Sequence, residues 1–174
     1  MKKTDRIRKE AGLTIEKIRS ITRHMRNVED SCLILGEKLI GRGEIQLGKN
    51  LIANGFIHDA SKLHGIEFEF MSPGINTNEE TAKLKMKMAI QQHRSVNPHH
   101  VEYWNSKIEN MPDVFLAELC CDLKARSEEF GSSFIDYIEE CVEKKWNINK
   151  ESKTYKRILD FVGLLCEIPF QEIK

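Results

Sequence analysis

Apolar residues recur every three or four positions along most of this chain, and that spacing is typical of one face of an α-helix. The first series predicts a buried stripe on a long helix that ends near Gly41; its members are Ile15, Ile18, Ile21, Met25, Val28, Cys32, Leu35 and Leu39. A second helix is predicted over residues 44–54. We expect Gly55 to break or bend that helix, because glycine is a poor helix former.

The remaining predicted helices are separated by residues that favour turns. Residues 65–78 contain Ser72-Pro73-Gly74 and are predicted to form a loop. Helices are predicted over residues 79–92, 112–130, 132–145 and 151–166, and Pro98 is expected to open a helical turn that contains His99 and His100. The sequence lacks the alternation typical of strands. We therefore expect an all-α fold in which residues 1–174 form one compact domain, a bundle of six to seven helices. Within it, residues 132–168 are expected to pack on a motif-containing core of about residues 20–130.

The composition narrows the class of function. The 174 residues carry 27 basic and 27 acidic side chains, so the formal net charge is zero, whereas proteins that bind duplex nucleic acid usually have a basic excess. No apolar run approaches the roughly 20 residues that span a bilayer. The five cysteines are odd in number and include the adjacent Cys120 and Cys121, which favours reduced thiols. We expect a cytoplasmic protein that binds neither duplex nucleic acid nor a membrane.

The histidines are clustered in a way that composition does not explain. None of the six lies in the last 74 residues. His24 and His93 occupy apolar faces of predicted helices, and so does Asp122. His58 and Asp59 are adjacent and follow an apolar pair. The pattern therefore turns several imidazoles and at least one carboxylate toward the interior.

Imidazoles and carboxylates that face one interior need strong compensation, because burying an ionised group is costly. A divalent cation supplies it, and these side chains are the usual ligands of such ions. The alternative is that each histidine is hydrogen-bonded separately in the core; His64 is expected at the surface. We expect one or two divalent transition metals per chain (Mn, Fe, Co, Ni or Zn) with these candidate ligands: His24, His58, Asp59, His93, His99, His100 and Asp122.

The order of these residues resembles the HD superfamily of metal-dependent phosphohydrolases. The segment His58-Asp59-Ala60-Ser61-Lys62 looks like the His-Asp-x-Gly/Ser-Lys element of the HD-GYP-type members, although the Gly-Tyr-Pro tripeptide is absent. That segment, with QQHRSVNPHHVEYW and CCDLKAR, is also similar to a largely uncharacterised HD-like family of bacteria and phages. The resemblance covers about residues 20–130.

The resemblance implies a division of roles among the candidate ligands. One metal would be held by His24, His58, Asp59 and Asp122, and Asp59 would bridge to a second metal held by His93 with either His99 or His100. The choice between those two histidines, and between one metal and two, stays open. A metal-activated water would attack a phosphoester, so no protein nucleophile is needed.

Further side chains near these motifs are candidates for substrate binding and proton transfer. The candidate catalytic residues are Asp59, Lys62 and Glu102, and the candidate phosphate-binding residues are Lys62, Arg94, Arg23 and Lys124. For Arg94 and Lys124 a solvated position is the alternative. Glu67, Glu69 and Glu102 are candidates for orienting a histidine through its second nitrogen. Tyr103-Trp104 suits either stacking on a base or core packing.

The resemblance and the small, neutral chain together favour a hydrolase of a small phosphorylated substrate, specifically a nucleotide. A di-iron oxygenase of the HD type is the first alternative, because a histidine-rich second site suits it. A catalytically silent, metal-binding regulatory module is the second. The last predicted helix, residues 151–166, is either core or the face of a homodimer.

Overall fold

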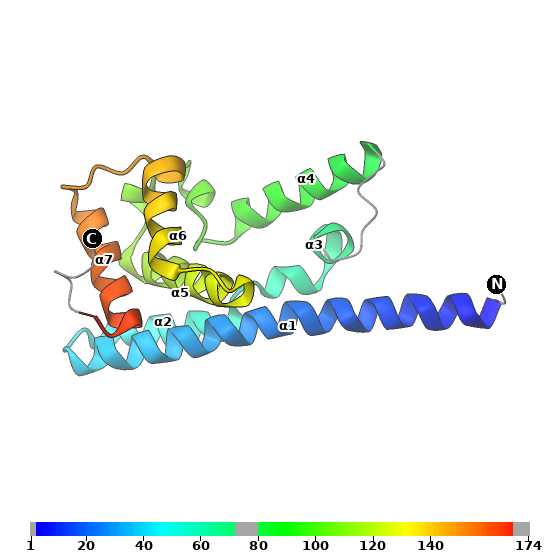
Figure 1. The fold of residues 1–174 in the computed structure, drawn as a ribbon, viewed down its shortest axis with the longest axis horizontal. Helices are drawn as coiled ribbons and strands as arrows, with labels where there is room; N and C mark the ends of the chain where they lie inside the picture. The colour runs from blue at the N-terminus through cyan, green and yellow to red at the C-terminus, as the bar shows by residue number, and fades with distance from the viewer. Residues whose placement is uncertain (1–2, 72–79, 169–174) are drawn as a thin grey trace.

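The structure is a computed structural model that describes residues 3–71 and 80–168, and it confirms the all-α prediction for them (Figure 1). The described residues form seven α-helices joined by short turns, without a strand. Their bounds are α1 (Lys3–Gly41), α2 (Ile45–Ile57), α3 (Gly65–Phe70), α4 (Glu80–Val96), α5 (Asp113–Phe130), α6 (Phe134–Glu140) and α7 (Lys153–Cys166). Three 3-10 turns, η1 (Ala60–Leu63), η2 (Val101–Trp104) and η3 (Ile108–Asn110), and one π-helical turn, η4 (Cys141–Trp146), complete them.

Helices α1 and α2 form a close antiparallel pair because glycines lie where they meet. A Cβ added at Gly48 would lie 2.4 Å from the carbonyl oxygen of Gly36, so the two backbones are almost in contact. The prediction that Gly55 breaks α2 is wrong, since the helix continues to Ile57. Gly55 lies where an added Cβ would be 2.7 Å from Cβ of Cys32, so its small size serves packing.

Helix α5 forms the centre of the core. It packs against α1, α2, α6 and α7, and side chains on several of its faces are buried. The helix ends at Gly131, in the left-handed conformation that favours glycine, as the sequence predicted. Because α5 is surrounded, polar residues on it must find partners inside the protein.

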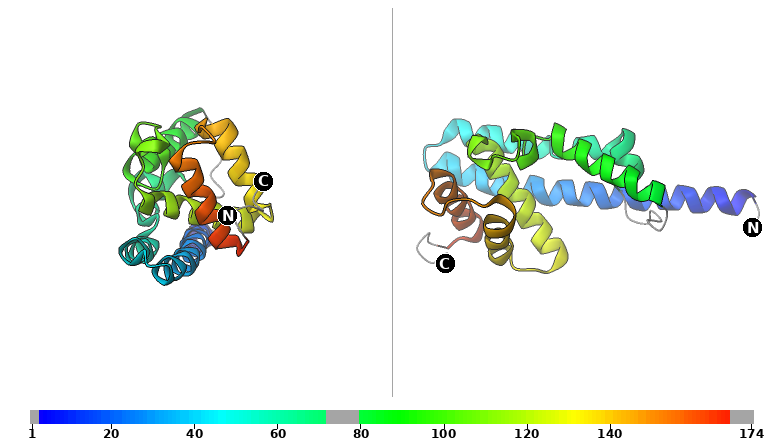
Figure 2. Two further views of the ribbon diagram at one scale, coloured as in Figure 1. Left: turned by 90° about the vertical axis from the view of Figure 1, so that its left-hand side faces the viewer. Right: turned by 90° about the horizontal axis from the view of Figure 1, so that it is seen from above.

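The first part of α1 is more exposed than predicted. Ile15 and Ile18 are 48% and 41% exposed, and burial begins at Ile21, which is 8% exposed. Figures 1 and 2 show that the N-terminal end of α1 projects beyond the other helices. The predicted stripe is therefore buried only from Ile21 onward.

Other departures from the predicted elements lie around the candidate ligands. Part of the predicted loop over residues 65–78 is the short helix α3, and the rest, including Ser72-Pro73-Gly74, lies outside the described residues. The turn after Pro98 is closed by a hydrogen bond from His100 N–H to Asn97 O, and the helical turn starts only at Val101. The helix predicted to reach residue 145 ends at Glu140 and continues as η4. Among the described helices, none combines the length and hydropathy needed to cross a membrane.

Candidate metal centre

The centre is built around the turn that follows α2. His58 caps the end of α2, and Asp59 adopts φ 56° and ψ 19°, in the left-handed region. Asparagine and aspartate tolerate this region better than most residues, but a non-glycine residue there is still uncommon and often functional. The reversal presents the side chains of both residues to the interior, where each is 1% exposed.

Four further segments bring the other candidate ligands to Asp59. His24 comes from α1, His93 from the end of α4, His99 and His100 from the turn after Pro98, and Asp122 from α5. These segments are up to 98 residues apart in sequence, from His24 to Asp122. All seven candidate ligands therefore meet in one place.

The two oxygens of Asp59 face two different sets of histidines. Oδ1 lies 3.2 Å from His93 Nε2 and 3.4 Å from His99 Nε2. Oδ2 lies 3.4 Å from His58 Nε2 and 3.6 Å from His24 Nε2. Two groups that share Asp59 have potential ligand atoms within 4.8 Å of one another: His24, His58 and Asp59, and Asp59, His93, His99 and His100. A third such group, without Asp59, consists of His58, His99 and Glu118.

Asp122 and His100 complete these groups from opposite sides. Asp122 Oδ1 lies 3.1 Å from His24 Nε2 and 3.9 Å from His58 Nε2. His100 Nε2 lies 2.9 Å from His93 Nε2. Both His99 and His100 thus lie in the second group.

Three carboxylates bind the outer nitrogens of the histidines. Glu129 contacts His24 Nδ1 at 3.0 Å, and Glu67 contacts His93 Nδ1 at 2.8 Å. Oε1 of Glu118 contacts two rings, His58 Nδ1 at 2.9 Å and His99 Nδ1 at 3.2 Å. Such outer partners fix the tautomer so that the other ring nitrogen faces inward, as in metal sites.

Ser61, inside the HDASK segment, supports this arrangement. Its hydroxyl donates to Glu67 Oε2 at 2.7 Å and accepts a hydrogen bond from Asn97 Nδ2 at 3.0 Å. Because Glu67 in turn contacts His93, the small hydroxyl residue two positions after Asp59 helps to hold the ring of His93.

The buried groups shift one another's pKa values. Burial by itself lowers the pKa of His58, but Asp59 and Glu118 outweigh it and raise that pKa to about 10. Burial opposes the ionisation of Glu118, yet its hydrogen bonds with His58 and His99 lower its pKa to about 2. The pKa of Asp59 also lies well below its usual value, since His58 and the other rings outweigh the effect of burial. In His100, burial and the charge on neighbouring histidines lower the pKa to about 3, so its ring is neutral.

Five buried atoms at the centre make no hydrogen bond within the described part of the chain: His24 Nε2, His58 Nε2, His99 Nε2, Asp59 Oδ1 and Asp122 Oδ1. Buried polar atoms are nearly always paired, so five together need an explanation. Imidazole nitrogens and carboxylate oxygens are the donors that divalent transition metals bind. These residues therefore fit a metal ion, and the cluster can hold one.

The other predicted site residues occupy varied positions. Lys62 is 9% exposed and its ammonium binds Oδ2 of Asp59. Within the described residues Glu102 forms no hydrogen bond with a histidine. It forms an ion pair with Arg94 at 3.0 Å, so the orienting role predicted for it belongs to other residues. Lys124 pairs with Glu128 of α5, and its side chain is 19% exposed, which does not match a solvated position.

The remaining candidates include three exposed side chains and one partly buried tryptophan. Arg23 is exposed on α1, beside a hollow that His24 also lines. Glu69 is exposed, and His64 lies at the surface as expected. Trp104 packs against Phe115 and donates its Nε1–H to Pro98 O, which favours core packing over base stacking.

A cavity of ≈ 420 Å³ opens beside the centre. Its lining includes Lys62, His93, Arg94, His100 and Asp122. Its size falls within the range of small-molecule sites, roughly 300–1,000 Å³. Three of the candidate ligands, His93, His100 and Asp122, are therefore accessible to a small molecule in this cavity.

Sequence reasoning did not name Glu118, Glu129 or Arg126, although a signal was present. Glu118 lies four residues before Asp122, Arg126 four after it and Glu129 seven after it. These spacings place them on the helix face of Asp122. The spacing can be seen in the sequence, but it does not show which charged side chains on that helix face point into the protein.

Comparisons with known proteins identify a family without a known activity. Residues 14–164 match the family of unknown function DUF5662, and the chain belongs to it. No curated protein and no solved structure matches the chain.

Proposed function

We propose that this member of the DUF5662 family is a metal-dependent phosphohydrolase that acts on a small phosphorylated substrate, specifically a nucleotide, through attack by water. The observation that carries the proposal is the sharing of Asp59 by two groups of buried ligand atoms. A carboxylate whose two oxygens face separate sets of histidines is suited to bridging two metal ions. The resemblance of the residue order to the HD superfamily supplies the reaction class.

The division of ligands follows the two oxygens of Asp59. His24, His58 and Asp122 would hold one cation with Oδ2, and His93 with His99 or His100 would hold the second with Oδ1. Bound cations would supply Lewis-acid polarisation of a phosphoryl oxygen and a water of lowered pKa. The mixed nitrogen and oxygen donors suit Mn²⁺, Fe²⁺, Co²⁺, Ni²⁺ or Zn²⁺.

Side chains of the cavity would bind and protonate the substrate. Lys62 lies beside Asp59 and lines the cavity, so its ammonium can bind a phosphoryl oxygen. Arg94 and Glu102 line the same cavity as an ion pair. In that position Arg94 can bind a phosphate oxygen, and the carboxylate of Glu102 can take a proton from the attacking water and pass it to the leaving oxygen.

Two features favour the alternatives. Three histidines around Oδ1 of Asp59 also suit a di-iron oxygenase. The ammonium of Lys62 binds Oδ2 of Asp59, where it competes with a cation, and this suits a regulatory module in which the centre is inactive. The five free cysteines, of which four are buried, are consistent with our proposal of a cytoplasmic protein.

Elemental analysis of the purified protein tests the proposal first. We expect one or two equivalents of a transition metal per chain, lost in Asp59→Ala and retained in the control Asp30→Ala, which changes an exposed aspartate of α1. Phosphate release from a panel of nucleotides then tests the reaction class. Iron with O₂ consumption and no phosphate release would favour the oxygenase, and bound metal with no turnover would favour the regulatory module. A wild-type protein that neither carries nor takes up metal would refute all three.

A further inference from the structure

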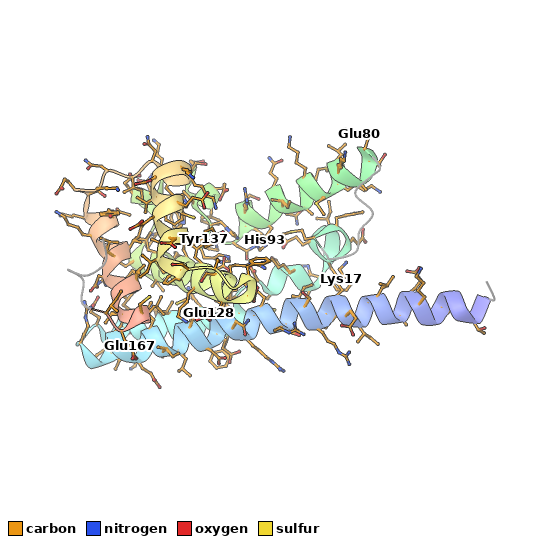
Figure 3. All side chains as sticks on the ribbon, in the orientation of Figure 1. Lys17, Glu80, His93, Glu128, Tyr137 and Glu167 are labelled. Carbon is orange, nitrogen blue, oxygen red and sulfur yellow. The ribbon has the colours of Figure 1, made fainter. Side chains whose placement is uncertain are left out.

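One wall of the cavity lies away from the candidate metal ligands. It includes Arg126 of α5, Tyr137 of α6, and Lys145 and Trp146 of η4, none of which has a role in the metal centre. Figure 3 labels His93 at the end of α4 and Tyr137 on α6, which line the same cavity. A substrate bound at the histidines would therefore extend toward this wall.

The wall carries a positive charge, the guanidinium of Arg126, that is available to bind a phosphate. Elsewhere in the cavity Lys62 is paired with Asp59 and Arg94 with Glu102. Arg126, in contrast, has a single long contact within the described residues, to Glu129 at 3.4 Å, and its side chain is 35% exposed. Arg126 also lines a hollow with His24 and Lys62 and another with Arg23 and His24, so three hollows beside the metal centre meet at this residue. A guanidinium there can bind a phosphate with two parallel hydrogen bonds.

The same wall carries aromatic rings. Trp146 packs against the hydrophobic core and also lines the cavity. The ring of Tyr137 lies below Lys145, whose ammonium is 4.8 Å from the ring centroid. Both Lys145 and Trp146 belong to a π-helical turn, a rare conformation that often occurs at functional sites. An aromatic ring held in place by core packing is a good platform for a planar ligand, at small entropic cost.

We infer that Arg126 and Trp146 determine the specificity of this site: Arg126 binds the phosphate of the substrate, and Trp146 stacks on a planar ring in its leaving group. The inference rests on the proposed function for the position of the phosphate. It assigns to Trp146 the base stacking that the sequence suggested for Tyr103-Trp104. The substrate class is then a phosphate ester of an alcohol that carries a planar aromatic ring, such as a nucleoside, rather than a simple sugar phosphate.

Binding of two matched probes tests the inference. The probes are the phosphonate analogues of adenosine 5′-monophosphate and of ribose 5-phosphate, which share the anion and the sugar but differ in the ring and have no ester bond to cleave. Titration calorimetry on the metal-loaded full chain should give about tenfold tighter binding of the adenosine compound, within the range of base–aromatic stacking. Quenching of tryptophan fluorescence should accompany binding of that compound alone.

Three variants separate the two roles. Trp146→Leu keeps apolar packing and should bring the two affinities within about twofold of each other, whereas Trp146→Phe should retain the preference. Arg126→Gln should weaken both probes about tenfold and leave their ratio unchanged. Lys144→Ala is the control, since this neighbour on η4 is 72% exposed and paired with Glu140, and it should change neither affinity. Circular dichroism verifies that each variant is folded.

The outcomes distinguish this inference from the proposed function. Equal binding of the probes to the wild type, or a preference that survives in Trp146→Leu, would overturn the inference even if the protein hydrolyses phosphoesters. The expected pattern in a protein without hydrolytic activity would support the inference and contradict the hydrolase. Loss of the preference in folded Trp146→Phe would also overturn it, because a stacking face remains there.

Discussion

Glu118 is the residue whose removal should affect both halves of the metal centre. Its Oε1 contacts His58 at 2.9 Å and His99 at 3.2 Å, and its Oε2 accepts a hydrogen bond from Asn54 at 3.0 Å. His58 faces Oδ2 of Asp59, whereas His99 faces Oδ1. One carboxylate therefore orients a ligand in each group. Glu129 and Glu67 each contact a single candidate ligand.

The magnitude follows from the contacts that are lost. Glu118→Ala would leave two buried ring nitrogens without partners and free both rings to turn. Removing an outer partner of a metal ligand typically weakens metal binding about 10–100-fold, or about 1.4–2.7 kcal/mol. We expect a loss of that size at each of two metals. Glu118→Gln retains an oxygen acceptor but not the charge, so its effect should lie near the lower end, about tenfold.

Competition with a chromophoric chelator measures this loss. Each variant is freed of metal, loaded with Mn²⁺, Co²⁺ or Zn²⁺, and titrated to give both stoichiometry and affinity. Glu129→Gln should weaken only the metal held by His24, which gives a one-site comparison. Glu128→Gln is the control, because this residue lies on the same helix but its side chain is 58% exposed.

Two results would refute the reasoning. Metal affinity of folded Glu118→Ala within about twofold of the wild type would mean that Glu118 does not orient the ligands. Weaker binding of only one of the two metal ions would mean that His58 and His99 do not belong to separate halves of the centre.

Further predictions concern stability and the approach of substrate. Metal at 100 times its Kd should raise the melting temperature by roughly 5–10 °C over that of chelator-treated protein, because only the folded chain brings the ligands together. If calorimetry shows no shift, the folded protein does not contain the proposed metal site. Gly48→Ala should lower the free energy of unfolding, measured with urea, by about 1–3 kcal/mol, because the new Cβ would lie 2.4 Å from the Gly36 carbonyl oxygen. Gly12→Ala, where nothing lies within 4 Å of the new Cβ, should raise it by up to about 1 kcal/mol. Lys62→Met should raise the KM for a phosphoester while metal content stays near that of the wild type; a loss of metal instead would make Lys62 a structural partner of Asp59.

Much of the fold was predictable because helical periodicity is a local property. The ends of α5 and the caps of α6 and α7 follow from residues near each end: Gly131 ends α5, and the hydroxyls of Ser133 and Ser152 accept hydrogen bonds at the starts of α6 and α7. The errors arose where contacts between distant segments decide. Gly55 stays helical and packs on Cys32, and Ile18 is 41% exposed although its neighbour Lys17 lies over the ring of Phe68 in α3.

The sequence by itself determined which side chains were candidates for the centre, because buried imidazoles and carboxylates on apolar faces are costly unless they share a partner. Only the tertiary structure decided which of them meet and in what arrangement. The two faces of Asp59 and the double contact of Glu118 depend on segments from four helices and a turn. Glu102 shows the limit, because it lies near the histidines in sequence yet turns to Arg94. Periodicity determines the face a residue occupies, but its partner depends on how whole helices pack.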